Sequence, residues 1–464
     1  MRVYCAVLLM SLLTAAPASA NRLDLFGGGA RGQGLGGGGG ALIDDHTALY
    51  FNPANLARGT VSAALNLDGA YDRTMILLMP RPNGYDPIGY ETRQSTRADL
   101  SDARKTGTYL LGLTARPFDE DLTIAFMALG SFDGLGRVST AFTDEREQYF
   151  SNQLQFELLG ERMRGELYAV GGSFRLRPWI SLGLGVLLLP QINVNTRVLT
   201  PNPSDPSDAE LNNEVENGMR QALTAGVMLH PTPALRLGVS FQDALFLDLE
   251  GANLIELAGA ETSLVTQSFA VAQSYSPVRL SVSASYEGRG GWQMALDSTW
   301  RGWSAYVDQH QAAVGFEDTV DFRVGWELPL DGGSVFRIGG GFTPSPVPSQ
   351  TGRTNYVDND RVVAGIGGQR PLDLWGHAFE LGLSVQIQAL VAATTRKEWV
   401  PGDPPLECAP GVESVCDEVP DSVSDSTLAP GVRSQGLQTG NPGFPGFTHG
   451  GYVVSAGLEI RWRY

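Results

Sequence analysis

Three sets of residues have types that could support chemistry: a glycine run near the N-terminus, five histidines and a pair of cysteines. The glycine run GLGGGG (34–39) fits a dinucleotide-binding pattern, but no predicted strand precedes it and no Gly-Lys-Ser/Thr step accompanies it. The histidines include no HExxH motif and no close pair; they are His46, His230, His310, His377 and His449. We therefore expect no cofactor, no metal site and no enzymatic activity.

The two cysteines of the expected mature chain, Cys408 and Cys416, lie in the Pro-rich acidic stretch VPGDPPLECAPGVESVCDEVPDS. A close, even pair in an exported chain suggests a disulfide. Two free thiols are the alternative, which an oxidising compartment disfavours. Zinc is a weaker reading still, because no histidine stands within ligand spacing.

Residues 1–20 read as a secretory signal peptide. Arg2 supplies a positive n-region, residues 6–16 form an apolar run, and Ala18-Ser19-Ala20 resembles a cleavage site. The apolar run is too short for a membrane helix, which needs about 20 apolar residues. The net charge of -17 argues against a nucleic-acid partner, since binding phosphates requires clustered Lys and Arg. We expect an exported protein.

The C-terminal segment alternates apolar and polar residues with a period of two. Apolar side chains stand at every second position, at Tyr452, Val454, Ala456, Leu458, Ile460, Trp462 and Tyr464. The residues between them are polar or small, apart from Val453. Only a β-strand places two such sets on opposite faces. Fourteen strand candidates follow from patterns of this kind: 61–78, 106–116, 121–132, 163–177, 179–196, 215–230, 234–249, 268–286, 291–301, 319–329, 334–343, 358–370, 374–396 and 449–464.

Short turns alternate with long polar segments between these candidates. The short turns are RPFDED, RPW, HPTPA, EGRGG, LPLDGG and RPLDLW, and the long segments are 80–105, 133–162, 197–214, 250–267, 302–318, 344–357 and 397–448. A soluble sandwich shares the period of two but has no reason to sort its loops by length. Periplasmic turns and extracellular loops of an outer-membrane barrel do so. The sequence predicts an all-β fold, a transmembrane antiparallel β-barrel of fourteen strands.

The chain resembles the long-chain fatty acid transporter family, FadL and its relatives that take up aromatic hydrocarbons. The resemblance is carried by GGGGALIDDHTALYFNPANL (37–56), WRGWSAY (300–306), TNYVDNDRVVAGIGG (354–368) and THGGYVVSAGLEIRWRY (448–464). It implies a fourteen-stranded barrel with an N-terminal hatch inside the lumen. The implied division is a signal peptide at 1–20, a hatch at 21–60 and a barrel at 61–464. The closing aromatic residue, Tyr464, is common to most outer-membrane barrels, and we expect it to serve as an assembly signal.

The resemblance also implies roles for residues of the hatch and of the third strand. It places Asn52, Pro53 and Ala54 in the hatch, although an Asn-Pro step is also an ordinary turn or helix-start signal. A wall gap, as found in the third strand of family members, would fall at Gly130, Asp133 and Gly134. Glycine and aspartate can break a ladder there.

Strand direction predicts a polar belt in the periplasmic half of the lumen, made of Arg236, Glu327, Glu380, Glu459, Arg461 and Arg463. Asp44 and Asp45 could pair with the arginines of this belt. The alternative is that the belt only solvates an aqueous lumen.

We expect passive, hatch-gated uptake of hydrophobic small molecules, either long-chain fatty acids or aromatic hydrocarbons, across the outer membrane of a Gram-negative bacterium. The expected partners are that ligand, outer-membrane lipid and lipopolysaccharide, and the barrel assembly machinery, with the protein a monomer. A membrane-embedded, phospholipase-like hydrolase using His310 or His449 and a structural or adhesive barrel are the alternatives. The first should release fatty acid from phospholipid, and the second should bind surfaces through its long acidic loops.

Overall fold

The computed structural model describes most of the chain between Arg22 and Tyr464. The described residues are 22–79, 102–118, 121–132, 141–142, 153–154, 166–200, 210–257, 264–307, 313–351, 354–374, 376–397, 418–419, 437–438 and 446–464. The expected signal peptide, Asp133, Gly134 and the pair Cys408 and Cys416 lie outside these ranges. Within them, no helix combines the length and apolar character needed to cross a membrane.

The main sheet contains sixteen strands and closes on itself. Closure comes from β7 (Ile180–Thr200) and β8 (Glu210–Leu229), which pair antiparallel with Ile180 opposite Leu229. Two of the sixteen strands, β10 and β11, lie outside the ring, which leaves fourteen in the barrel and confirms the prediction. The other twelve are β1 (Ser62–Leu78), β2 (Asp102–Ala115), β3 (Leu122–Ser131), β6 (Leu167–Arg177), β9 (Leu235–Gln242), β12 (Arg279–Glu287), β13 (Gln293–Arg301), β14 (Thr319–Pro329), β15 (Val335–Thr343), β16 (Arg361–Leu374), β17 (His377–Arg396) and β20 (Gly446–Arg463).

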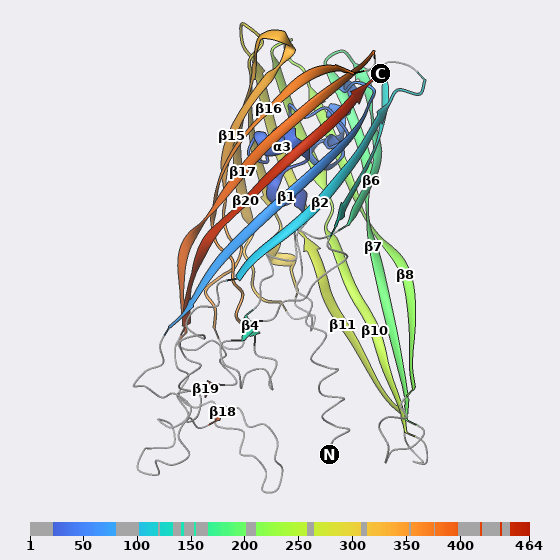
Figure 1. The fold of residues 1–464 in the computed structure, drawn as a ribbon, viewed down its shortest axis with the longest axis vertical. Coiled ribbons are helices and arrows are strands. Elements are labelled where there is room, and N and C mark those ends of the chain that lie inside the picture. Colours follow the sequence, from blue (N-terminus) through green and yellow to red (C-terminus); the bar gives the residue numbers. More distant parts are fainter. Residues whose placement is uncertain are drawn as a thin grey trace.

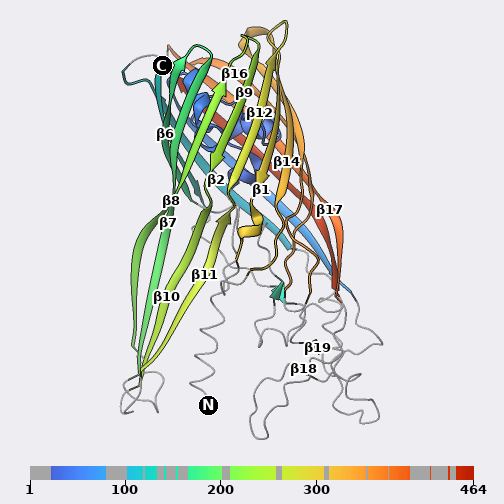
Figure 2. The same cartoon turned by 180° about the vertical axis from the view of Figure 1, so that it is seen from behind.

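An additional hairpin, β10 (Leu245–Leu257) and β11 (Leu264–Ser276), extends from the barrel. β10 pairs in parallel with the far end of β7, and the four strands β7, β8, β10 and β11 project beyond the others (Figures 1 and 2). The predicted single strands at 234–249 and 268–286 were wrong, because each is divided. The first ends before Asp243, whose side chain accepts a hydrogen bond from the Ala244 N–H at 2.8 Å. The second is interrupted at Pro277, which has no N–H for a ladder.

Short connections gather at the end of the barrel that holds the C-terminus, which we call the turn end (Figure 1). One predicted turn, RPLDLW (370–375), is misplaced, since β16 continues to Leu374 and Pro371 pairs with Glu380 of β17. On its other side β16 pairs with β15 only as far as Gln369. The missing N–H of Pro371 therefore interrupts no second ladder, and proline is tolerated there.

The outside of the barrel is apolar and the inside is polar. In β9, Leu237 and Val239 point outward and are 39% and 48% exposed, whereas Arg236 points inward and is 4% exposed. In β20, Ile460 is outward and 46% exposed, and Arg461 is inward and 5% exposed. A soluble sandwich buries its apolar face, so this arrangement is that of a barrel whose outer face contacts lipid.

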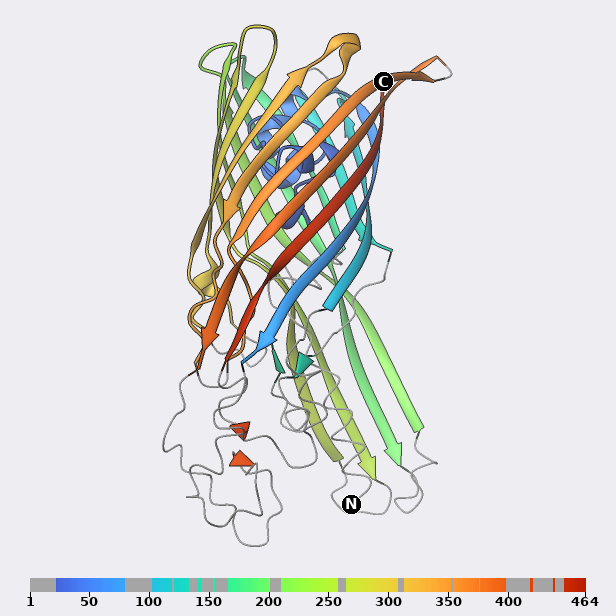
Figure 3. The ribbon, with the colours of Figure 1, turned by 60° about the vertical axis from the view of Figure 1, so that its left-hand side comes forward.

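Residues 22–58, called the N-terminal segment below, lie inside the barrel toward the turn end (Figures 1 and 3). The segment contains α2 (Arg22–Phe26), α3 (Gly29–Gly34), α4 (Ala48–Phe51) and the 3-10 helix η1 (Pro53–Arg58). α3 contacts β15, β16, β17 and β20, and η1 contacts β3, β6, β7 and β8. The segment therefore touches opposite sides of the wall and occupies the lumen.

An aromatic cluster joins segments on the side opposite the turn end. It consists of five buried rings: Tyr275, Trp303, Tyr306, Phe316 and Tyr356. The rings of Tyr306 and Phe316 stack at 4.8 Å between centroids, and Tyr356 meets Phe316 edge-on at 5.0 Å. The cluster ties the end of β11 and the short helix η6 (Trp303–Ala305) to the segments that precede β14 and β16. Such ring contacts stabilise beyond simple area burial, by about 0.5–1.5 kcal/mol per pair.

Candidate functional site

The N-terminal segment is docked to the wall by buried ion pairs, and the first of these is centred on Asp24. Its Oδ1 accepts hydrogen bonds from Arg279 and Arg301, each at 2.8 Å, and Arg301 also donates to Asp321 at 2.8 Å. Arg279 lies over the ring of Tyr50, 4.1 Å from its centroid. Burial alone would raise the pKa of Asp24, but Arg301 and Arg279 outweigh it and hold that pKa well below its usual range. Asp24 is thus a carboxylate at neutral pH.

A second ion-pair group forms around Arg31 of α3. Its guanidinium makes two parallel hydrogen bonds to Glu327 of β14, at 2.7 and 2.9 Å, and a third bond to Asp44 at 2.7 Å. Glu327 also accepts from Arg337 of β15 at 2.6 Å. Bidentate arginine–carboxylate pairs of this kind are among the stronger hydrogen-bonded contacts in proteins. They fix the orientation of α3 as well as its position.

A third group links Asp45 to the last barrel strand. Arg461 of β20 donates to Asp45 at 2.5 Å and to Glu459 at 2.7 Å. Glu459 in turn accepts the backbone N–H of Ala30 at 3.1 Å. Burial would raise the pKa of Asp45, but the guanidinium groups of Arg461 and Arg31 hold it well below its usual range. Asp45 and Arg461 are therefore a charged pair that joins the two ends of the chain.

Glycines let the segment and the wall approach at backbone distance. Gly36, with φ +70°, faces Gly340 of β15, and a methyl group built on Gly36 would stand 2.7 Å from the Gly340 nitrogen. On the other side, a methyl group on Gly183 of β7 would overlap Pro53 and Ala54, and one on Gly226 of β8 would overlap Asn52. Glycine is required at such contacts because any side chain occupies the same space.

The wall also satisfies backbone groups of the segment. The carboxylate of Asp297 in β13 accepts the N–H groups of Gly39 and Gly40 at 2.7 and 2.9 Å. On the opposite side, Gln386 of β17 donates to the carbonyl of Phe26 at 3.0 Å. Buried backbone groups without partners are costly, so these contacts allow a glycine-rich segment to be buried without a large apolar core.

His46 lies beside Asp45 and is buried, with neither ring nitrogen hydrogen-bonded to a described residue. Burial lowers its pKa, with Arg461 acting in the same direction and Asp45 opposing it. Its ring fills the space over Gly112 of β2, where a methyl group would overlap it. His46 is therefore a neutral packing residue at pH 7.

The segment leaves little open space beside β9, β12, β13 and β14. A cavity of about 40 Å³ lies there, bordered among others by Asp24, Gly38, Phe51 and Arg323. A cavity that accepts benzene measures about 150 Å³, whereas one water needs roughly 10–15 Å³. This cavity admits water but no hydrocarbon ring, so passage along this side requires movement.

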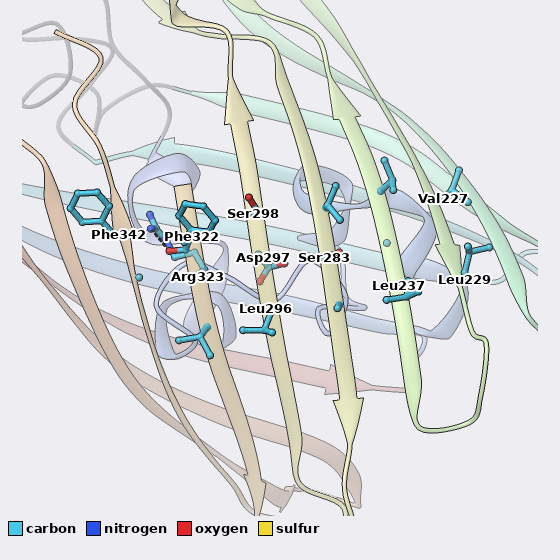
Figure 4. A pocket seen from close by; sticks show the side chains of 16 residues that line it. Val227, Leu229, Leu237, Ser283, Leu296, Asp297, Ser298, Phe322, Arg323 and Phe342 are labelled. Carbon is cyan, nitrogen blue, oxygen red and sulfur yellow. Dashed lines mark hydrogen bonds between the residues drawn. The ribbon is translucent and has the colours of Figure 1, made fainter. Parts of the chain in front are cut away.

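The outer face of the same wall region carries an apolar hollow of about 810 Å³ (Figure 4). Val227, Leu237, Leu296, Phe322 and Phe342 line it, all pointing away from the lumen. Asp297 and Arg323 border both this hollow and the lumenal cavity, so a single sheet separates the two spaces. The described ladders of β13 with β12 and β14 run without interruption, so the wall is closed there.

Several residues singled out from the sequence come together in the lumen. Arg461 pairs with both Asp45 and Glu459, and Glu380 pairs with Arg463 at 2.6 Å. Asp44 instead pairs within the segment, with Arg31. Arg236 stands apart from these groups and lies 3.3 Å from Glu287. Tyr464 is 71% exposed at the turn end, with its ring against Trp462.

Asn52, Pro53 and Ala54 lie at the start of η1, and Gly130 is the one residue of the expected wall gap that lies within the described residues. The Asn52 side chain accepts the Ala54 N–H at 3.1 Å and caps η1, so Asn-Pro-Ala acts locally as a helix start. Gly130 lies within β3, paired with Tyr109 of β2, whose ring fills the space a side chain would take. Asp133 and Gly134 are outside the described residues. The gap stays a prediction.

Most residues that dock the N-terminal segment to the wall were not predicted from the sequence. They include Asp24 and Arg31 of the segment and Arg279, Asp297 and Arg301 of the wall. A signal for three of them existed, since Arg279, Asp297 and Arg301 occupy inward positions of predicted strands. Of the histidines named for a hydrolase, His449 is buried with its Nδ1 3.0 Å from Asn359 Oδ1, and His310 lies outside the described residues.

Comparison with known proteins gives the following matches. Residues 166–371 match the model of a family described as outer membrane protein transport protein (OMPP1/FadL/TodX). No curated protein matches the chain. A FadL homologue of Pseudomonas aeruginosa aligns over 97% of this chain and 99% of its own, at 13% identity and a TM-score of 0.55. A TodX deltaS2S3 mutant, a monoaromatic hydrocarbon channel, aligns over 95% and 100% at 12% identity and a TM-score of 0.51. These structural likenesses show the shared fold.

Proposed function

With residues 166–371 matching this transport family, we propose that the FadL-like outer-membrane barrel is a channel for passive uptake of hydrophobic small molecules. In this proposal, residues 21–60 act as a hatch, residues 61–464 form the channel wall, and residues 1–20 are the signal peptide. The observation that carries it is the N-terminal segment, held in the lumen by ion pairs to β12, β13, β14 and β20. A channel blocked by a polar, docked segment is suited to gating.

Transfer of the solute follows from its chemistry. An apolar molecule gains roughly 25 cal/mol per Å² of surface removed from water, which favours entry from the long-loop side. Uptake down the concentration gradient requires no other energy source. Binding along the route must stay weak enough for the molecule to be released. The docked segment then has to shift, because the lumen beside it holds only about 40 Å³ on the β12–β14 side.

A reversible tether tests this proposal. A Cβ atom built on Gly382 of β17 would stand 3.3 Å from the Cβ of Ala30 in α3, close to the separation found in disulfides. The double variant Ala30→Cys with Gly382→Cys, made in a background with Cys408 and Cys416 replaced by serine, should lock α3 to the wall. We expect uptake of a labelled hydrophobic probe into proteoliposomes to stop on oxidation and return with dithiothreitol.

The two single-cysteine variants are the controls, and their uptake should not respond to oxidation. Full uptake by the oxidised, cross-linked double variant would show that α3 does not move during transport. Absence of uptake by the wild-type protein for fatty acids, alcohols and aromatic hydrocarbons alike would contradict the channel function itself.

A further inference from the structure

The neighbouring strands β2, β1 and β20 form one side of the barrel wall (Figure 1), and aromatic residues mark both membrane interfaces on its outer face. On β20, Trp462 lies at the turn end, and Tyr452 lies ten positions earlier with only apolar residues at the outward positions between them. Ten strand residues of about 3.4 Å each, tilted by about 45°, cross roughly 24 Å, which matches the apolar band of outer-membrane barrels. Long loops are extracellular in such barrels, so Tyr452 stands at the interface with the outer leaflet.

Two cationic side chains point outward at the same interface. Arg73 of β1 lies directly opposite Tyr452 in the ladder, and Lys105 of β2 lies directly opposite Tyr71 of β1. Arg73 and Lys105 are therefore diagonal neighbours on one face, a relation in which residues stand about 7–8 Å apart. Both side chains are exposed, and neither makes an ion pair or a hydrogen bond with a described residue.

These two positive charges have no counter-charge on their own face. The outward side chains described on β1, β2 and β20 include no aspartate or glutamate, although the whole chain carries a net charge of -17. The carboxylate next to Arg73 along β1, that of Asp72, is 2% exposed and points into the lumen. One cation costs little at this depth, but like charges on neighbouring strands repel each other. An anion between the two side chains would replace this repulsion by attraction.

A phosphate group has the chemistry that this arrangement fits. The guanidinium of Arg73 presents a fork of donors that matches two phosphate oxygens, and the ammonium of Lys105 adds a charge on a flexible stem. The rings of Tyr71 and Tyr452 stand 6.2 Å apart beside the two cations, and neither hydroxyl is hydrogen-bonded to a described residue. Tyrosine is enriched at membrane interfaces because its ring is apolar and its hydroxyl binds polar groups.

The outer surface leaves room for a hydrocarbon chain directly beside these side chains, toward the middle of the membrane. Gly69 of β1 pairs with Gly107 of β2 on one side and with Ala456 of β20 on the other. No heavy atom lies within 4 Å of a methyl group built on Gly69. The outward residues of β1 and β20 in the rows on either side are larger: Leu67 and Leu458, and Tyr71 and Val454.

We propose that Arg73 and Lys105, with Tyr71 and Tyr452, bind a phosphate group of lipopolysaccharide in the outer leaflet, and that an acyl chain of the same lipid lies along Gly69. Lipopolysaccharide is the phosphorylated lipid of that leaflet, whereas phospholipids occupy the periplasmic leaflet. The site is on the outer face of the wall, so it is separate from the proposed uptake route and does not depend on it.

The test titrates lipid A carrying two phosphates onto delipidated protein in detergent and counts the bound molecules by native mass spectrometry. The double variant Arg73→Gln with Lys105→Gln should weaken lipid A binding about tenfold or more, the factor expected for loss of a charge-assisted hydrogen bond. Arg177→Gln with Arg289→Gln is the matched control, because it removes two exposed charges at the turn end. This control should bind lipid A as wild type does. Circular dichroism should show the same strand content in all three proteins.

Three further probes identify what the site recognises. Lipid A without phosphates should bind wild type as weakly as intact lipid A binds the Arg73 and Lys105 double variant. Phosphatidylglycerol should bind wild type more weakly than lipid A, and millimolar inorganic phosphate should not displace lipid A.

Equal lipid A binding by wild type and the Arg73 and Lys105 double variant would overturn the site and show that these side chains only reach toward water. Equal binding of the dephosphorylated lipid by wild type would also overturn it. Preference for phosphatidylglycerol would assign the surface to phospholipid, and displacement by phosphate would assign it to free anions; either result contradicts the proposal.

Discussion

Asp24 offers the sharpest test of how the N-terminal segment is held. Replacing it with asparagine leaves Arg279 and Arg301 buried with one carboxylate fewer, although Arg301 keeps Asp321 at 2.8 Å. Breaking a buried ion pair by removing one partner costs about 3–5 kcal/mol, and the retained Asp321 favours the lower end, about 3 kcal/mol. Since about 1.4 kcal/mol is a factor of ten, undocking of the segment should become roughly a hundredfold more frequent.

Hydrogen exchange followed by mass spectrometry measures this directly in detergent-solubilised protein. Amides of residues 22–58 should exchange roughly a hundredfold faster in Asp24→Asn, while those of the barrel strands stay unchanged. Asp331→Asn, in the exposed turn helix η7 (Asp331–Gly333), is the matched control and should leave exchange as in wild type. Equal protection of the segment in both variants would refute the ion-pair account. Faster exchange throughout the barrel would show instead that segment and wall unfold as one unit.

Two further predictions concern the same docking. Gly226→Val places a side chain where Asn52 lies and should displace that end of the segment, which should raise the single-channel conductance in planar bilayers. The control is Gly69→Val, at a β1 position with open space around it, which should leave the conductance unchanged. Equal conductance in the two variants would contradict the account based on close backbone contact. Because burial lowers the pKa of His46, the undocked form binds more protons below its ordinary value of about 6.5. Docking should be strongest above pH 6.5 and weaken as pH falls, by at most about 1.4 kcal/mol per unit. The segment's exchange, corrected for intrinsic rates, should show this dependence between pH 7.5 and 5.5, and a profile identical to that of His46→Gln would remove His46 as its source.

The parts of the fold that local patterns determine were predictable from the sequence. Alternation with a period of two assigns each residue of a strand to one face without knowledge of its neighbours, so the inward positions of Arg236, Glu327 and Arg461 followed directly. Strand number followed from the same pattern together with loop lengths. The division at Asp243 was missed because the alternation of Leu235 to Phe241 resumes in the same phase at Leu245. At Pro277 the apolar positions change phase, from Val271 and Tyr275 to Val278 and Leu280, so that break did have a signal in the sequence.

The ion-pair partners in the lumen were harder to predict, because closure of the barrel determines which inward residues lie close together. Asp45 and Arg461 are 416 positions apart, and Asp24 and Arg301 are 277 apart. A list of inward charges leaves many pairings possible, and only the register between strands selects among them. Asp44 shows the difference, since a belt arginine was the expected partner and Arg31 of its own segment is the observed one.

Pairing of β20 with β1 brings the two ends of the chain together, with Arg463 opposite Ser62. The N-terminal segment thus emerges beside β20, the last of the described barrel strands along the sequence, and one of its ion-pair partners, Arg461, belongs to that strand. The binding surface of the segment is incomplete until β20 has joined β1. Complete docking of the N-terminal segment therefore requires the seam between β1 and β20 to be closed, and we expect an unclosed barrel to leave residues 22–58 open to proteolysis. Their protection from proteolysis would then be a marker of completed barrel assembly.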